Sequence, residues 1–229
     1  MAEKKKVERE FVEASTGKTG KRPAVVTAAN KKSATGKRVA AVILWVAAEV
    51  GAILMLNGTW YIPEEQKMYW LIGALVIDLI LVIIGSQLWK KANRLDPGSK
   101  QSSVKFFLWN NMGLIASVIC FLPIVILLLA NKDLDGKTKK IVTVVAAIAL
   151  VLASLFSIDF NPVSAEELAD AQQAVGTGTV YWTRFGKSYH LDPNCHTLMR
   201  SSKVYRGTIE EAFEANRTDP CDFCALEQE

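Results

Sequence analysis

Residues 68–89 read MYWLIGALVIDLILVIIGSQLW, a run of 22 residues in which Asp78 is the only charged side chain. A membrane-spanning helix needs about 20 mostly apolar residues, and lipid requires the backbone polar groups to be satisfied within the segment. Three further apolar runs flank this one, at residues 39–56, 106–130 and 141–158. The sequence therefore predicts four transmembrane helices within residues 39–158, the first and last of them near the lower length limit.

The composition leaves room for one small soluble domain beside the membrane block. The chain has 229 residues, 50% of them hydrophobic and 9% aromatic, and about half of its length lies in the apolar runs. Residues 1–38 contain eleven Lys or Arg and four Glu, whereas residues 159–229 contain six Lys or Arg and twelve Asp or Glu. The first 38 residues contain no apolar core of signal-peptide length, so we expect the first apolar run to serve as the insertion signal.

The basic segment at residues 1–38 is expected to be disordered. Its Lys, Ala, Thr and Gly residues offer too little apolar surface to offset the entropy lost on ordering. The segment could bind anionic lipid headgroups or nucleic acid. Alternatively, it is a solvated tail whose Lys31, Lys32, Lys37 and Arg38 hold the first helix in orientation. Aromatic residues for base stacking are absent from its basic stretches, which favours the solvated tail over nucleic-acid binding.

The charges between the apolar runs predict the membrane orientation. The N-terminal segment is basic, and residues 90–105 contain five Lys or Arg, whereas residues 57–67 contain one Lys and two Glu. The positive-inside rule then places both termini in the cytoplasm, with the helices in the cell (inner) membrane. The loop at residues 131–140 disagrees, because it contains four Lys and two Asp. Trp89 and Trp109 fit the inner aromatic belt.

Two carboxylates lie within the apolar runs, Glu49 near the middle of the first and Asp78 near the middle of the second. The two helices are expected to be antiparallel neighbours, so the side chains could share one depth in the membrane. An intramembrane acid is costly and by default indicates a functional site, such as one for a proton or a cation. The alternative is a protonated acid that hydrogen-bonds across the helix interface. Neither run supplies a Lys or Arg counter-ion.

Small and polar residues follow one another at helical spacing in the third and fourth runs. They are Asn110, Gly113, Ser117 and Cys120 in the third run and Ala146, Ala149, Ala153 and Ser157 in the fourth. Small residues let helix backbones approach closely, so these faces are expected to pack against other helices.

The chain changes character after residue 158. Residues 159–178 are expected to form a helical linker, which begins at a capping box made by Ser164 and Glu167. Short alternating segments after residue 179 predict strands, and a second capping box at Thr208 predicts one more helix. Residues 179–229 are therefore expected to form a small α+β domain.

This domain contains two pairs of metal-ligand residues. His190 and Cys195 flank an Asp-Pro-Asn turn, and Cys221 and Cys224 form a Cys-x-x-Cys pair. Such pairs, separated by a strand and a helix, are the donors that a tetrahedral zinc site uses, and His196 is a competing ligand. Two other interpretations remain open. The last two cysteines could be a redox dithiol, although no thioredoxin-like βαβ pattern surrounds them, or disulfides could form outside the cytoplasm and leave one cysteine unpaired.

At these residues the chain resembles the small metal-binding domain of the Ada DNA-repair proteins. The resemblance covers about residues 179–226 and none of the membrane block, and both the order of elements and the ligand spacing agree. It implies a structural zinc ion held by His190, Cys195, Cys221 and Cys224. In Ada itself the first ligand is a cysteine that accepts a methyl group. His190 stands at that position here, so the resemblance does not extend to methyl transfer.

The sequence thus predicts a mainly α protein: a four-helix transmembrane bundle followed by a small C-terminal α+β zinc-binding domain. We expect a non-enzymatic function, in which the cytoplasmic tail binds or scaffolds a protein partner. One alternative is a small transporter or channel subunit that uses Glu49 and Asp78, with Asn110 as a further intramembrane polar residue. Another is a membrane thiol oxidoreductase that uses the tail cysteines. The oligomeric state stays open, a homo-oligomer included.

Overall fold

The computed structural model describes residues 11–12, 19–20, 26–56, 63–132, 134–199 and 201–225. The described chain divides into a helical bundle, formed by residues 26–163, and a C-terminal domain that begins at residue 164. Most of the segment predicted to be disordered lies outside the described residues. Its described parts are an antiparallel pair of two-residue strands, β1 (Phe11–Val12) and β2 (Thr19–Gly20), and residues 28–38, which are helical.

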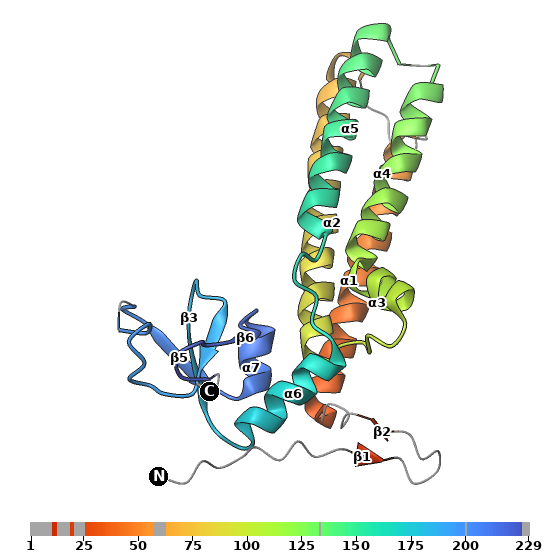
Figure 1. Ribbon diagram of the computed structural model, residues 1–229. Helices are drawn as coiled ribbons and strands as arrows, with labels where there is room; N and C mark the ends of the chain where they lie inside the picture. The colour runs from red at the N-terminus through yellow and green to blue at the C-terminus, as the bar shows by residue number, and fades with distance from the viewer. Residues whose placement is uncertain are drawn as a thin grey trace, which may run out of the picture. The chain divides into compact units, whose positions relative to one another are not determined.

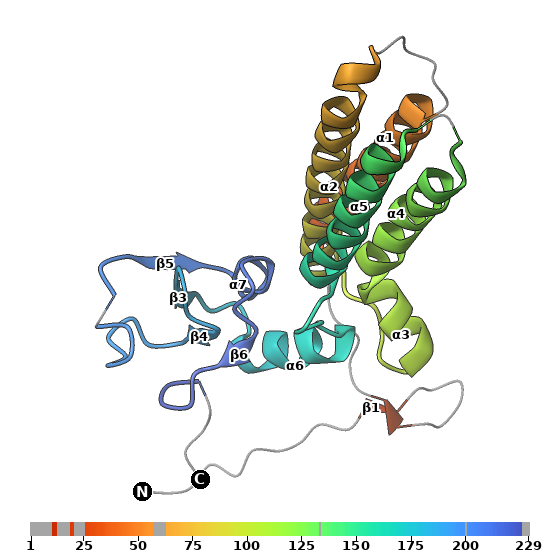
Figure 2. The same ribbon diagram turned by 90° about the horizontal axis from the view of Figure 1, so that it is seen from above.

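Five helices make up the bundle. They are α1 (Ala28–Leu56), α2 (Glu64–Leu95), α3 (Ser103–Asn110), α4 (Met112–Ala130) and α5 (Gly136–Ser157). Figures 1 and 2 show α1, α2, α4 and α5 lying side by side, with the short α3 at one end. The interior between these four long helices is filled by apolar side chains such as Val82, Phe121, Leu128 and Val142, each of which is fully buried.

Within the described residues, three helices rather than the predicted four are long and apolar enough to cross a membrane. They lie at Glu65–Leu95, Met112–Ala130 and Gly136–Ser157. The prediction of four is corrected at α1. That helix begins eleven residues before the predicted Val39, and its first three turns contain Lys31, Lys32, Lys37 and Arg38. Its apolar part, residues 39–56, also contains Glu49.

The third apolar run was predicted as one helix over residues 106–130, but it is divided between α3 and α4. The break lies at Asn111, whose backbone (φ −103°, ψ 25°) leaves the helical region. Its side-chain amide donates to the Phe107 carbonyl at 3.0 Å and its Oδ1 accepts from the Asp159 amide at 3.3 Å. Asparagine competes for backbone groups in this way and so favours helix ends over helix interiors. The break also ties α3 to the end of α5.

Helices α2, α4 and α5 approach closely through a chain of hydroxyl groups. Ser157 Oγ donates to Ser86 Oγ at 2.8 Å, and Ser117 Oγ donates to Ser157 Oγ at 3.0 Å. Gly113 lies beside them, and a Cβ atom built there would meet Ser86 Oγ at 2.7 Å. The small-residue faces predicted for the third and fourth runs are buried here, as close helix packing requires.

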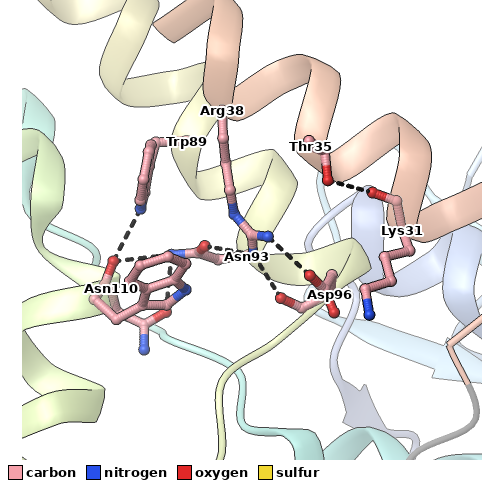
Figure 3. Close-up of polar contacts among 8 residues, drawn as sticks. Lys31, Thr35, Arg38, Trp89, Asn93, Asp96 and Asn110 are labelled. Atoms are coloured by element: carbon pink, nitrogen blue, oxygen red, sulfur yellow. Dashed lines mark hydrogen bonds and ion pairs between the residues drawn. The ribbon is translucent and has the colours of Figure 1, made fainter. Parts of the chain in front are cut away.

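One end of the bundle is held by Arg38 of α1 (Figure 3). Its guanidinium donates to Asp96 Oδ2 at 2.8 Å, to the Asp96 carbonyl at 2.7 Å and to Asn93 Oδ1 at 3.2 Å. It also lies 5.1 Å from the ring centre of Trp109, within the range of a cation–π contact. Arg38 was predicted to act as an orienting charge in a solvated tail, whereas here it lies between helices and pairs with Asp96.

One of the two tryptophans predicted for the inner aromatic belt is also inside the bundle. Trp89 is 6% exposed, and its ring centre lies 5.6 Å from that of Trp45 and 5.3 Å from that of Trp109. Its indole N–H donates to the Trp109 carbonyl at 2.9 Å. A buried Trp needs such a partner for its N–H. The three rings, in tilted and edge-on contacts, therefore join α1, α2 and α3, and Trp109 is 37% exposed.

The C-terminal domain consists of a linker helix, a four-stranded sheet and one short helix. The linker helix α6 (Ala165–Val175) begins at the capping box predicted from Ser164 and Glu167. The sheet has the order β5-β3-β4-β6, and α7 follows β5 in the chain. The elements are β3 (Val180–Thr183), β4 (Ser188–His190), β5 (Val204–Gly207), α7 (Ile209–Glu214) and β6 (Asp219–Pro220). Strand β3 is antiparallel to both β4 and β5, and β6 is parallel to β4.

The contact at Gly113 makes a prediction for the stability of the bundle. Gly113→Leu should lower the free energy of unfolding by about 1–3 kcal/mol, because the new side chain overlaps Ser86 and forces α2 and α4 apart. The matched control is Gly73→Leu in α2, where a Cβ atom would meet no atom within 4 Å. Thermal unfolding in detergent should show a lower midpoint for the first variant only. Equal midpoints for the two variants would contradict this close packing.

Candidate metal centre

Pairing between β4 and β6 places two of the four predicted ligands side by side. Strand β4 ends at His190, and the parallel register aligns Tyr189 with Pro220. The amide of Cys221 donates to the Tyr189 carbonyl at 3.0 Å, which extends the pairing by one residue. Residues next to each other in a ladder share one region of the sheet, so Cys221 lies beside His190 although 31 positions separate them.

Two turns bring in the other ligands. The amide of Cys195 donates to the Asp192 carbonyl at 3.2 Å, closing the Asp-Pro-Asn turn that the sequence predicts. The side chain of Asp192 also accepts from the Asn194 amide at 2.9 Å, as Asx residues do in turns. At the end of the chain, the Ala225 amide donates to the Cys221 carbonyl at 2.8 Å and closes the Cys-x-x-Cys turn around Cys224.

The four ligand atoms form a cluster of the size that a tetrahedral metal ion requires. One atom from each of His190, Cys195, Cys221 and Cys224 lies within 4.8 Å of every other. Cys195 Sγ and Cys221 Sγ are 3.9 Å apart, and Cys224 Sγ lies 3.6 Å from His190 Nδ1. Zinc–sulfur bonds of about 2.3 Å and zinc–nitrogen bonds of about 2.0 Å at tetrahedral angles give separations of about 3.5–3.8 Å. The residues therefore fit a metal ion without rearrangement of the backbone.

The surroundings of the cluster suit metal binding. His190, Cys195 and Cys221 are buried and Cys224 is half-buried. Burial lowers the pKa of His190, so its ring is neutral near pH 7 and keeps a lone pair for a metal. Burial raises the pKa of the Cys224 thiol to about 11, against the opposing effect of the Asp192 and Leu191 amides. A cation bound to such a thiol replaces its proton, so metal binding at this site releases protons.

Thr197 is a contributor that sequence reasoning did not identify. Its hydroxyl lies 3.1 Å from Cys195 Sγ and 3.4 Å from His190 Nδ1, and its backbone amide hydrogen-bonds to the same sulfur. Groups behind the ligands fix the orientation of a site and tune its donors. Thr197 could have been found from its position two residues after Cys195. A turn that follows a cysteine ligand directs backbone amides back to the sulfur of that cysteine.

The geometry bears on His196 as a competing ligand, and the state of the cysteines bears on disulfides. His196 is not in the cluster, because its ring packs edge-on against Phe223 with 4.4 Å between ring centres. All four cysteines of the chain are described, and all are free thiols. Cys120 lies in the bundle, where it is buried and donates weakly to the Trp45 carbonyl at 3.8 Å.

The three predicted intramembrane polar residues are buried to different extents and are not part of the metal cluster. Asn110 is a packing residue, since it donates to the Phe106 carbonyl at 2.9 Å and accepts from Asn93 at 3.3 Å. Asp78 is 3% exposed, and neither of its oxygens has a hydrogen-bond partner among the described residues. One buried oxygen of Glu49 also has none, and the charges of Glu49 and Asp78 act on each other.

Comparison of the chain with protein-family models, curated proteins and solved structures finds no match. What the structure supports by itself is a cluster of one histidine and three cysteines that could hold a metal ion, in a chain with three candidate membrane helices. The resemblance to the Ada metal-binding domain therefore remains a prediction based on this chain's own residues.

The geometry of the cluster predicts its response to substitution. The full-length protein should contain one metal ion per chain, measured by mass spectrometry of the purified protein. Cys221→Ser and Cys195→Ser should each lose the metal, and hydrogen exchange in residues 179–225 should rise, because metal binding supplies folding free energy. The matched control is His196→Ala, which lies next to a ligand but outside the cluster and should retain the metal.

The membrane helices serve as the internal reference for the same measurement. Their hydrogen exchange should not change in any of the three variants, because their backbone bonds form within each helix. If a strong chelator removed no metal, or left exchange in residues 179–225 unaltered, the metal would not hold this domain together.

Proposed function

We propose that this chain is an integral membrane protein whose C-terminal domain is folded around a structural zinc ion and binds a protein partner. The cluster of four protein ligands carries the proposal. Structural zinc sites are closed by four protein ligands, whereas catalytic sites keep one position open for water or substrate. A site closed by His190, Cys195, Cys221 and Cys224 thus favours a binding or scaffolding role over catalysis.

The size of the domain explains why it needs a metal. Domains of about 50 residues rarely bury enough apolar surface to be stable alone and commonly use metals or disulfides. Here the main buried apolar side chains are Val180, Tyr189, Leu198, Ile209 and Phe213. On this proposal the domain is a zinc knuckle similar to that of the Ada proteins. His190 in place of the methyl-accepting cysteine means that methyl transfer is not part of the proposal.

The exposed side chains of the domain support binding of a protein partner. Phe185 is 89% exposed, and Met199, Phe223 and Tyr205 are also exposed. Aromatic side chains and methionine are enriched at protein interfaces relative to other surfaces. Residues 159–229 are also acidic overall, so a partner with basic side chains around an apolar centre fits this surface best.

We further propose that α1 lies in the membrane with the other three long helices, in the cell (inner) membrane, and that both termini are cytoplasmic. The outward side chains of α1, among them Val39, Ile43, Val46 and Val50, are apolar and exposed. Its opposite face contributes Ala41, Trp45 and Ala48 to the bundle interior. A helix that is apolar on all sides is typical of a membrane or a large core. The basic N-terminal segment would contact anionic headgroups on the cytoplasmic side.

Labelling of single cysteines tests the orientation. With α1 in the membrane, cysteines introduced at Ser15 and Glu227 should both be protected from an impermeant thiol reagent in intact cells and labelled after lysis. The native cysteines are kept, because a protein without them would lose the metal. Labelling of the native protein under the same conditions is the reference. If α1 does not cross, the two positions lie on opposite sides, and exactly one of them should be labelled in intact cells.

Photo-crosslinking tests the binding role. A photoreactive amino acid at Phe185 of the full-length protein should give a discrete adduct in cells, and the same residue at exposed Lys132 in the bundle should not. Cys221→Ser should abolish the adduct, because loss of the metal unfolds the surface. The partner, identified by mass spectrometry, should bind the purified protein with an affinity that falls as salt rises. Adducts of equal yield at both positions, or adducts unaffected by Cys221→Ser, would exclude a metal-dependent docking surface.

A further inference from the structure

A cavity of about 500 Å³ lies between α1 and α2, within the bundle and apart from the metal centre. Half of its lining residues are small, namely Ala47, Ala48, Gly51, Ala52, Gly73 and Ala74. Cβ atoms built at Gly51 and Gly73 would meet no atom within 4 Å, so both glycines face open space. The volume falls in the range of about 300–1,000 Å³ that is typical of small-molecule sites.

The cavity opens on the outer face of the bundle. Tyr69, Trp70 and Ile77 belong to its lining and are 69%, 52% and 61% exposed. The surrounding surface of α1 and α2 is apolar, with Val46, Val50 and Ile80 exposed nearby in the sequence. A molecule dissolved in the lipid phase can therefore reach the cavity sideways.

Asp78 is the polar group of this cavity. It belongs to the lining, is 3% exposed, and neither carboxylate oxygen has a hydrogen-bond partner among the described residues. The buried serine and asparagine side chains of the bundle differ in this respect, since Ser117 bonds to Ser157 and Asn110 bonds to Asn93. A buried carboxyl group without a partner is costly, and its cost is relieved by a ligand that supplies a donor or a positive charge.

Among the described residues, no cationic side chain forms an ion pair or hydrogen bond with Asp78. Glu49, which has the same sign, acts electrostatically on it. The cationic end of α2, at Lys90, Lys91 and Arg94, lies more than three helical turns further along the chain. Two acids and no base within the apolar part of α1 and α2 make the region complementary to a cation.

We propose that the cavity between α1 and α2 binds a lipophilic ammonium compound, with its cationic nitrogen at Asp78 and its apolar body along the small-residue wall. The aromatic rings of Tyr69 and Trp70 at the opening suit such a ligand, because aromatic faces attract ammonium groups. The small residues leave space for an alkyl or aryl body. This inference goes beyond the proposed function and does not depend on it, since no residue of the metal centre takes part.

Equilibrium binding to the full-length protein in phosphatidylcholine nanodiscs tests the site. Radiolabelled dodecylamine is the probe, and empty nanodiscs give the background to be subtracted. We expect saturable binding of one dodecylamine per chain, with an affinity at least about tenfold lower in Asp78→Asn, because charge-assisted hydrogen bonds are the strong ones. Dodecanol, which has the same chain without the charge, should fail to compete.

Two glycine variants separate the cavity from the rest of the helix surface. Gly73→Leu fills the cavity and should weaken dodecylamine binding at least about tenfold. Gly36→Leu adds the same side chain to an exposed position of α1, where a Cβ atom also meets nothing within 4 Å, and should bind normally. Thermal midpoints of Asp78→Asn and Gly73→Leu should equal or exceed that of the native protein, because neither change removes a contact.

Four results would overturn the proposal. Unchanged dodecylamine binding in Asp78→Asn would remove the carboxylate from the site. Competition by dodecanol as strong as that by dodecylamine would show a merely apolar cavity. If chemical crosslinking in nanodiscs gave a dimer that Gly73→Leu abolished while dodecylamine binding persisted, a second copy of the chain would occupy the cavity. A lowered midpoint in Asp78→Asn would show that Asp78 is a packing residue with a partner inside the bundle.

Discussion

The guanidinium of Arg38 is the interaction on which the arrangement of the helical bundle depends. Arg38 is on α1, yet its hydrogen bonds reach Asn93 and Asp96 at the far end of α2, and its ring contact reaches Trp109 of α3. Helices in lipid gain little from burying apolar surface against each other, so polar contacts of this kind decide which helices are neighbours. One side chain thereby aligns the start of α1 with the end of α2 and with α3.

The rest of the bundle is consistent with that alignment. Trp45, Trp89 and Trp109 stack in a row from the interior to the Arg38 end, and the hydroxyl groups of Ser86 and Ser157 join α2 to α5. The buried serine and asparagine side chains of the interior have hydrogen-bond partners. Asp78 has none among the described residues, and it lies where small residues also leave space between α1 and α2. An unpaired buried carboxyl group and an empty cavity at the same place indicate a ligand more strongly than either does alone.

The C-terminal domain depends on a different constraint. Its sheet is short, its helix α7 has six residues, and several of its large apolar side chains face solvent. What converges is a set of metal ligands from β4, the following turn and the residues after β6. Hydrophobic burial positions the bundle, whereas on the proposed function a cation holds the turns of this domain together. On that proposal the two parts of the chain are stabilised in different ways, and each can be perturbed without the other.

The sequence by itself determined what depends on local pattern. Long apolar runs predicted membrane helices, and Ser164 and Glu167 predicted the start of α6, because these signals involve residues a few positions apart. The spacing of the metal-ligand residues predicted their convergence, because it follows a known ligand geometry; they are His190, Cys195, Cys221 and Cys224. The helix boundaries of α1 and the break at Asn111 were not predictable in this way.

Only the tertiary structure decided the features that require two distant segments. The pairing of Arg38 with Asp96, the burial of Trp89, the contact of Thr197 with the metal ligands and the isolation of Asp78 all depend on which helix or turn lies opposite. From the sequence, Arg38 at the edge of an apolar run is expected to face solvent. The apolar run does not show that its partner Asp96 lies 58 positions away. The periodicity of one helix gives its apolar face, but the neighbour of that face is set by packing between helices.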